Sequence, residues 1–217
     1  MNGYKKEMNF LNHFFKKQPS YTLYILEDGV QKILKNPKIK GLKLKIQGTN
    51  NKIFLEKPFN FINCTISCRG NNNVFYFEKT KYFVSNLAIY ANDFLDNRTL
   101  IIKENFSVNS ADICLYSPNS KLTIGQDCMF SSDIKILTGD AHNILDKNGK
   151  ILNTTHDMSI DNHVWLCTRS TIIKNVNIPK NCIIAAGSVV VKSFEQENSI
   201  IAGNPAKIVK RNINWER

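Results

Sequence analysis

Aliphatic residues recur every six positions through the second half of the chain. The longest run is Ile160, Leu166, Ile172, Ile178, Ile184 and Val190. A second series, four residues further on in each hexad, is small or β-branched: Val164, Ser170, Val176, Cys182 and Ser188. A period of six matches neither an ordinary strand nor a helix. It predicts a solenoid whose coils have three flat faces, with the aliphatic residue inside and the small residue at the corner.

The first half carries a longer form of the same repeat. Residues 44–50, 66–72, 87–93, 113–119 and 134–140 each alternate apolar and other residues and then turn at Gly, Asn or Asp. These turn residues tolerate left-handed backbone conformations. The sequence therefore predicts one β-helix over residues 40–192, whose early coils are longer than three hexads.

Three segments depart from the repeat. Residues 1–39 mix aromatic and charged side chains, which is typical of a cap on the open end of a solenoid. The hexad register breaks between Ile136 and Ile160, which predicts an excursion at about 137–159. Residues 193–217 pass through Asn204-Pro205 into a basic stretch, for which we expect a turn followed by a short helix or tail.

Charge and composition restrict the partners and the cellular location that we expect for the protein. The net charge is +11, from 29 Lys and Arg against 18 Asp and Glu. The lysines are spread along the chain and no aromatic-basic module is visible, so we expect no nucleic-acid partner. No run approaches the roughly 20 apolar residues of a membrane span, and the first residues lack the apolar core of a signal peptide. Six scattered cysteines without a CxxC pair favour reduced thiols over disulfides or metal. These features predict a cytoplasmic protein, or one at the inner face of the membrane.

Three motifs between residues 160 and 211 carry a resemblance. They are Asp161-Asn-His-Val-Trp165-Leu, Ile184-Ala-Ala-Gly-Ser188-Val-Val and Ala202-Gly-Asn-Pro-Ala-Lys207. With the hexads, this stretch resembles the hexapeptide-repeat acyltransferases over about residues 105–211, most of all the galactoside, maltose and capsular-polysaccharide O-acetyltransferases. The resemblance implies a left-handed parallel β-helix, a homotrimer, and acetyl-CoA bound in a groove between subunits.

The chain also departs from the family pattern. The glycine that usually follows the inward aliphatic residue is kept only at Ile124-Gly125. Relatives often carry an asparagine one coil before the catalytic histidine. Asp112 and Asn109 lie near that place in the sequence, and the pattern does not decide between them.

His142 is the candidate catalytic base. It follows the last regular repeat, at the mouth of the excursion, and the resemblance places the family's catalytic histidine there. Transfer of an acetyl group from a thioester to a hydroxyl needs a base that removes the hydroxyl proton, and imidazole serves at neutral pH. The alternative is a surface-loop histidine. Asp140 either orients the ring or is a turn residue.

A zinc site is a competing interpretation of the histidines. His156 and His163 join His142 in the pattern of the zinc-dependent carbonic anhydrases that share this architecture, which need three nitrogen ligands. His163 stands beside Trp165 as in the acetyltransferases, so we expect no metal.

The coenzyme contacts follow from residue matching to the family. Trp165 is expected to point outward, either as a wall of the acceptor and thioester site or as a subunit contact. Thr168 and Ala186 are expected to line the pantetheine groove, where small side chains let backbone groups pair with its amides. Lys192, Lys207 and Lys210 fall where relatives direct basic residues toward the coenzyme phosphates. Each lysine alone is more often a solvated surface residue, but together the three supply the positive charge that the phosphates need.

Together these features predict an acetyl-CoA-dependent O-acetyltransferase acting on a sugar hydroxyl. The acceptor is expected to be a bacterial surface polysaccharide (capsule, lipopolysaccharide or a sialic-acid-containing glycan) or its precursor. Two alternatives remain: N-acetylation of an amino sugar or sugar nucleotide, and a non-catalytic β-helix scaffold. The first would in many cases need a nucleotide-binding N-terminal domain, for which residues 1–40 are too short.

Overall fold

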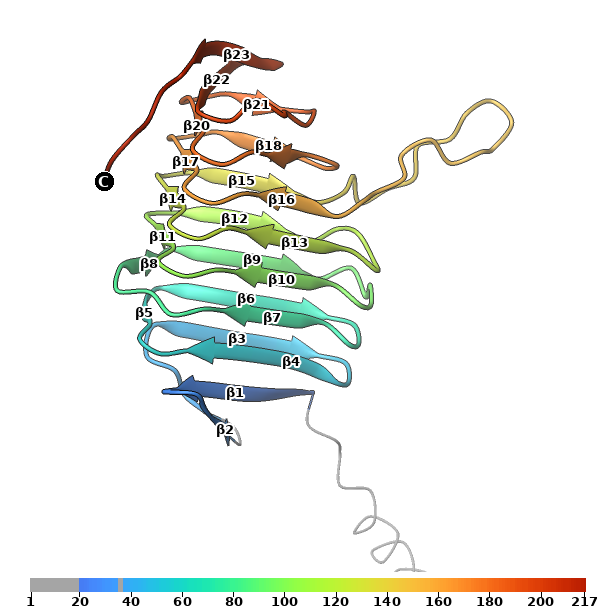
Figure 1. Cartoon of the computed structure of the whole chain (residues 1–217). Coiled ribbons are helices and arrows are strands. Elements are labelled where there is room, and N and C mark those ends of the chain that lie inside the picture. The colour runs from blue at the N-terminus through green and yellow to red at the C-terminus, as the bar shows by residue number, and fades with distance from the viewer. Residues whose placement is uncertain (1–19, 35–36) are drawn as a thin grey trace, which may run out of the picture.

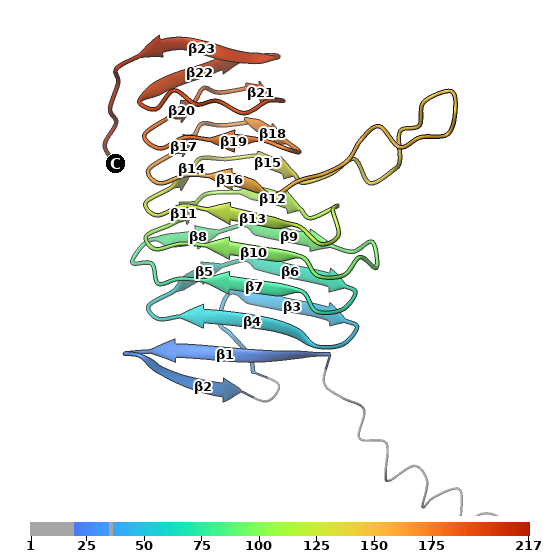
Figure 2. The ribbon, with the colours of Figure 1, turned by 45° about the vertical axis from the view of Figure 1, so that its right-hand side comes forward.

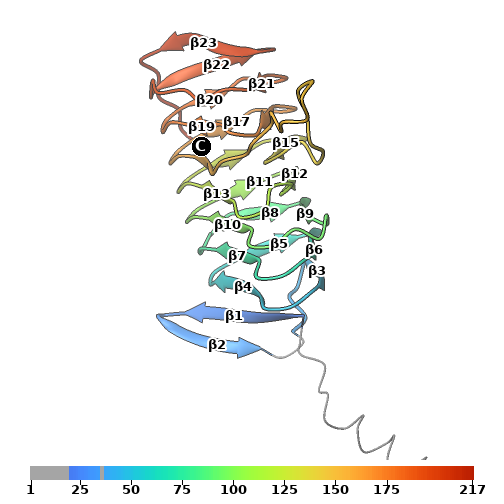
Figure 3. The same ribbon diagram turned by 90° about the vertical axis from the view of Figure 1, so that its right-hand side faces the viewer.

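Three sheets of short strands run the length of the molecule and form a triangular solenoid (Figure 1). A computed structural model describes residues 20–34 and 37–217. We name the three sheets A, B and C. Successive strands pass from sheet B to sheet A to sheet C and back to sheet B, and neighbouring coils pair in parallel. This arrangement is consistent with a left-handed parallel β-helix. Figure 3 shows the coils stacked as one column between two terminal hairpins.

The strands of each sheet follow in chain order. Sheet A contains β1 (Tyr21–Glu27), β2 (Val30–Leu34), β4 (Asn51–Glu56), β7 (Val74–Phe77), β10 (Thr99–Ile102), β13 (Lys121–Ile124), β16 (Met158–Ile160) and β19 (Asn177–Ile178). Sheet B contains β3 (Leu42–Gln47), β6 (Cys64–Arg69), β9 (Leu87–Ala91), β12 (Ala111–Cys114), β15 (Ile134–Leu137), β18 (Thr171–Ile173) and β21 (Val189–Val190). Sheet C contains β5 (Asn60–Ile62), β8 (Phe83–Ser85), β11 (Ser107–Val108), β14 (Met129–Phe130), β17 (Trp165–Leu166), β20 (Ile183–Ile184), β22 (Ser199–Gly203) and β23 (Ala206–Arg211).

The hexad positions form the interior of the solenoid. Ile160 pairs with Ile124 and Ile178 in sheet A, while Leu166 stacks between Phe130 and Ile184 in sheet C. All these side chains are buried, and so is the offset series from Val164 to Ser188. Each buried aliphatic side chain contributes about 1.5–3 kcal/mol through the area it removes from water. The six-residue period in the sequence therefore identifies the buried core positions.

A buried polar ladder lies inside the corner between sheets B and A in the longer coils. Asn51 Oδ1 accepts hydrogen bonds from the backbone and side-chain amides of Asn73, and Asn73 Oδ1 accepts one from Arg98 Nε at 2.9 Å. The Arg98 guanidinium is 1% exposed and also donates to the carbonyls of Ala91 and Leu115. Burial lowers the pKa of Arg98. The ladder satisfies carbonyl groups that the extended turns leave without strand partners.

The N-terminal end is closed by a hairpin. β1 pairs in parallel with β4, and β2 folds back on β1 as an antiparallel edge. Sheet A therefore begins at Tyr21, earlier than the β-helix boundary predicted at residue 40. Residues 1–19, the first half of the predicted cap, lie outside the described part of the chain.

The C-terminal end corrects one expectation. Where a helix was one alternative, β22 and β23 form an antiparallel hairpin that turns at Asn204-Pro205 (Figure 2). β22 continues sheet C on β20, so its edge offers backbone partners to β23. Ala206 of β23 is buried, whereas Lys207 is exposed. The basic stretch is therefore a strand that ends at Arg211, and residues 212–217 form a tail that returns along the side of the solenoid.

The predicted excursion corresponds to an arm between β15 and β16. Residues 138–157 project from the corner between sheets B and A (Figures 1 and 2). Leu145 and Ile151 form an antiparallel bridge near its tip. The arm exposes four large apolar side chains, Ile144, Leu145, Ile151 and Leu152. Within residues 20–34 and 37–217, no helix has the length and apolar character to cross a membrane.

Candidate functional site

The base of the arm is held by Asp140. Its Oδ2 accepts hydrogen bonds from Lys174 Nζ, which follows β18 on the next coil, and from Asn153 Nδ2 at 2.7 Å. Asn153 Nδ2 also lies 2.7 Å from the His142 carbonyl oxygen, so one carboxamide joins the outgoing and returning segments of the arm. Lys174, and then Asn153, hold the pKa of Asp140 below its usual range.

His142 itself is exposed at the mouth of the arm. Within the described residues its imidazole has no hydrogen-bond partner, while its backbone is held through Asn153. Asp140 therefore pairs with Lys174 instead of with the imidazole in this structure. Sequence reasoning missed Lys174 and Asn153. Lys174 would have emerged from the register, because Leu137 pairs with Ile173 once the arm is removed from the count.

Trp165, Thr168 and Ala186 lie on another part of the solenoid. Trp165 is half-buried on the outer face of β17 in sheet C, and its Nε1 donates to Ser131 Oγ at 3.0 Å. Thr168 and Ala186 occupy the corner between sheets C and B on adjacent coils, where the Gly187 amide donates to the Thr168 carbonyl. The arm leaves from the corner between sheets B and A, across the solenoid from sheet C (Figure 1). One chain therefore does not bring Trp165 and His142 together.

Two of the three predicted phosphate-side lysines meet in one hollow. Lys192 and Lys207 line a depression of about 470 Å³ together with Arg211 and Glu195. Lys210 is not part of its lining. On β23 the strand alternation separates neighbouring side chains, and the register is irregular between Ile200 and Ile201 of its partner β22. Sequence reasoning missed Arg211 because it allowed for a helix in this stretch. In a strand, alternate residues share a face, so Arg211 lies on the same side as Lys207.

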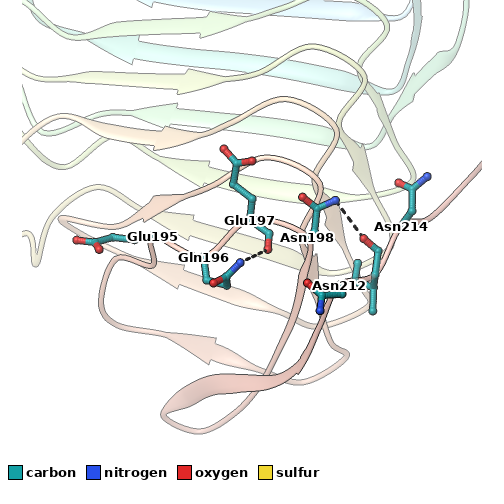
Figure 4. A pocket seen from close by; sticks show the side chains of 7 residues that line it. Glu195, Gln196, Glu197, Asn198, Asn212 and Asn214 are labelled. Atoms are coloured by element: carbon teal, nitrogen blue, oxygen red, sulfur yellow. Dashed lines mark hydrogen bonds between the residues drawn. The ribbon is translucent and has the colours of Figure 1, made fainter.

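A second hollow lies beside the start of the tail (Figure 4). It measures about 780 Å³ and is lined by Glu195, Gln196, Glu197, Asn198, Asn212, Ile213 and Asn214. Carboxylates and carboxamides supply its polar surface, and no lysine or arginine lines it. The hollow around Lys192 and Lys207 therefore differs from this one in carrying cationic side chains.

The remaining histidines occupy separate places. His156 lies in the returning segment of the arm, whereas His163 lies at the corner between sheets A and C and stacks on Trp215. No group of three or more side chains that could hold a metal ion occurs in the described ranges. One coil before the mouth of the arm stand Tyr116 and Ser117, which bond to Thr138, so neither Asp112 nor Asn109 holds that position.

Known proteins share this architecture over most of its length. No family model matches the chain. The polysialic acid O-acetyltransferase of Neisseria meningitidis is 34% identical over 176 residues, covering 81% of this chain and 80% of that protein. The solved structure of the polysialic acid O-acetyltransferase OatWY superimposes with a TM-score of 0.76 at 29% identity, covering 92% of this chain and 89% of that one. The polySia-specific acetyltransferase NeuO gives a TM-score of 0.70 at 26% identity, covering 93% and 80%.

Fold and similarity agree on one class of enzyme. The chain belongs to the hexapeptide-repeat acetyltransferase family. Within that family it is similar to polysialic acid O-acetyltransferases, which confirms the prediction of an O-acetyltransferase and sets aside the scaffold alternative.

Proposed function

We propose that this chain transfers the acetyl group of acetyl-CoA to a hydroxyl of a sialic acid polymer, with His142 as general base. The observation that carries the proposal is the similarity to a polysialic acid O-acetyltransferase over 81% of the chain. The net charge of +11 also suits a polyanionic acceptor, because a positive surface raises the local concentration of such a substrate.

The reaction needs one proton to move twice. The imidazole of His142 takes the proton of the sugar hydroxyl as its oxygen attacks the thioester carbonyl. The carbon–sulfur bond then breaks, the acetyl group stays on the sugar oxygen, and the imidazolium returns the proton to the CoA thiolate. The exposed imidazole at the mouth of the arm leaves room for both substrates, and Lys174 and Asn153 keep that mouth in place through Asp140.

A complete site requires two copies of the chain. His142 stands at the B–A corner, while Trp165, Thr168 and Ala186 stand on sheet C and the C–B corner. We assign His142 of one copy and the Trp165 face of its neighbour to the same groove in a homotrimer. The four exposed apolar residues of the arm support this assembly, because a group of apolar side chains left in water is costly and these four are exposed in one chain.

The coenzyme phosphates are assigned to the hollow around Lys192, Lys207 and Arg211. Three cations within one depression offer the positive charge that phosphates need, and Arg211 adds a planar donor fork. Thr168 and Ala186 line the pantetheine part of the groove, with small side chains that leave backbone groups accessible. Lys210 stays outside this hollow and is assigned to the solvated surface.

The test combines two products of the same reaction. Purified protein with acetyl-CoA and polysialic acid should release free CoA thiol in step with acetyl ester formed on the polymer, measured by NMR. Dextran, a neutral polymer, should give thiol release at the rate of slow hydrolysis only. Equal ester formation on dextran would contradict the sialic acid assignment, and an absence of ester on both would contradict the proposed reaction.

A further inference from the structure

The tail after β23 is fastened to the solenoid at three points. At the first, beside the hollow of Figure 4, the Ile213 amide donates to the Asn198 carbonyl at 3.0 Å and Asn198 Nδ2 donates to the Ile213 carbonyl at 3.2 Å. At the last, Arg217 lies 4.2 Å from the ring centroid of Tyr82 and donates to the carbonyls of Asn105, Asp127 and Cys128. The tail therefore bridges coils that are far apart in the stack.

The middle attachment is the most specific. Trp215 Nε1 donates to the His163 carbonyl at 2.9 Å, and the His163 ring bonds through Nε2 to the Trp215 carbonyl at 3.0 Å. The two rings stack with centroids 4.1 Å apart and planes 7° apart. Trp215 is 6% exposed, although it belongs to no coil of the solenoid. The two reciprocal hydrogen bonds and the stacking on His163 together fix the position of the Trp215 ring.

Trp215 also meets Trp165. Their ring centroids are 5.9 Å apart with planes inclined at 45°. Trp165 stands on the outer face of a flat sheet, where an aromatic side chain is otherwise free to change its rotamer. Its Nε1 bond to Ser131 restrains one edge, and Trp215 restrains the ring from the side of His163. These two contacts decide where the Trp165 ring projects.

We infer that residues 212–217 form a strap whose Trp215 positions Trp165 for acetyl transfer in the neighbouring subunit's groove. The inference rests on the proposed function, in which Trp165 is a wall of the site. It makes Trp215 and His163 positioning residues, because they act on the reaction through Trp165. A wall displaced by about 1 Å costs up to about 100-fold in rate, so holding this ring is a catalytic requirement.

Fluorescence can follow Trp165 directly, because the chain has two tryptophans. Trp215→Phe and Trp215→Ala each leave Trp165 as the single tryptophan, which can be excited at a wavelength where the seven tyrosines do not absorb. The Phe variant keeps a ring against Trp165, and the Ala variant does not. We expect acrylamide to quench Trp165 at least twofold more efficiently in the Ala variant than in the Phe variant. The kcat should fall about tenfold in the Ala variant and less than threefold in the Phe variant, with the KM for acetyl-CoA within twofold in both.

Arg217→Ala in the Trp215→Phe background is the matched control. It releases the far end of the strap and should lower the thermal midpoint, while leaving Trp165 quenching and kcat as in Trp215→Phe. Equal quenching in the Ala and Phe variants would overturn the inference, and so would a control that quenches and slows as much as Trp215→Ala. If no form of the protein transfers acetyl groups, the proposed function fails. The quenching comparison then still decides whether Trp215 holds Trp165.

Discussion

Lys174 and Asp140 are 34 residues apart in the chain and form an ion pair at the root of the arm. Their side chains are 21% and 25% exposed, which places the pair in a region of reduced solvent screening. Asn153 joins the same carboxylate to the His142 backbone. The position of the proposed base is thus set by a residue on the following coil.

This ion pair should make the stability of the wild-type protein depend on pH. The pKa of Asp140 is lowered in the folded protein, first by Lys174. Its stabilisation is therefore fully present above the unfolded-state pKa of about 4 and disappears as the pH falls through the lower folded-state value. Asp140→Asn should cost about 1 kcal/mol at pH 7, and the cost should shrink progressively as the pH falls below about 4. Thermal melts of both proteins across this range measure the difference, and a gap that persists in acid would contradict the pairing.

His142→Ala should remove the general base and leave the solenoid unchanged. We expect kcat to fall by about 10²–10⁴, with the KM for acetyl-CoA within a few-fold, because pantetheine contacts lie on other coils. His156→Ala is the matched control on the same arm and should cost far less. Chelators should leave the rate unchanged. Near-full turnover in His142→Ala, with loss in His156→Ala, would assign the base to the other histidine.

Substitutions of Lys207 and Arg211 should weaken the binding of acetyl-CoA, whereas substitution of Lys210 should not. Lys207→Ala and Arg211→Ala should each raise the KM for acetyl-CoA several-fold and reduce its dependence on salt. Lys210→Ala keeps the same change of charge outside the hollow and should leave that KM within twofold. Steady-state kinetics at two ionic strengths test this comparison. Equal effects from all three substitutions would indicate a diffuse surface field instead of a phosphate site.

The two-copy site can be tested by complementation. His142→Ala and Trp165→Ala chains should each be poorly active alone. Co-expressed in equal amounts, they should regain about a quarter of wild-type sites, because a groove with both intact residues forms where the two variants meet in the right order. Light scattering should show a trimer for every sample. A mixture no more active than its components would place both residues in one chain's site, or Trp165 outside the site.

Arg98 should be essential for stability although it lies in no site. Its guanidinium is buried and bonds to Asn73 and to several carbonyls of neighbouring coils. Arg98→Ala removes every one of these donors and leaves a cavity, so unfolding free energy should fall by about 3–5 kcal/mol. Arg69→Ala, at an exposed position on β6, should change it by less than about 0.5 kcal/mol. Denaturant unfolding measures both.

The inward residues could be predicted from the sequence because their environment repeats. Every coil places an aliphatic side chain against the same position of the coil below, so burial imposes a six-residue period on the amino-acid sequence. Ile160, Leu166 and Ile172 are therefore core in both views. The arm was visible for the same reason, since an insertion interrupts a regular count. The candidate His142 came from its place at that interruption and from the family resemblance.

Contacts between distant coils could not be predicted in this way. Arg98 reaches Asn73, Lys174 reaches Asp140, and Trp215 folds back onto His163, each through side chains whose spacing in the chain carries no period. The choice of strand over helix for Ala206–Arg211 likewise depended on the free edge that β22 presents. By itself the sequence determined the solenoid and its core, because local pattern and burial coincide there. Only the tertiary structure decided which polar side chains meet, because stacking the coils brings together residues that the chain keeps apart.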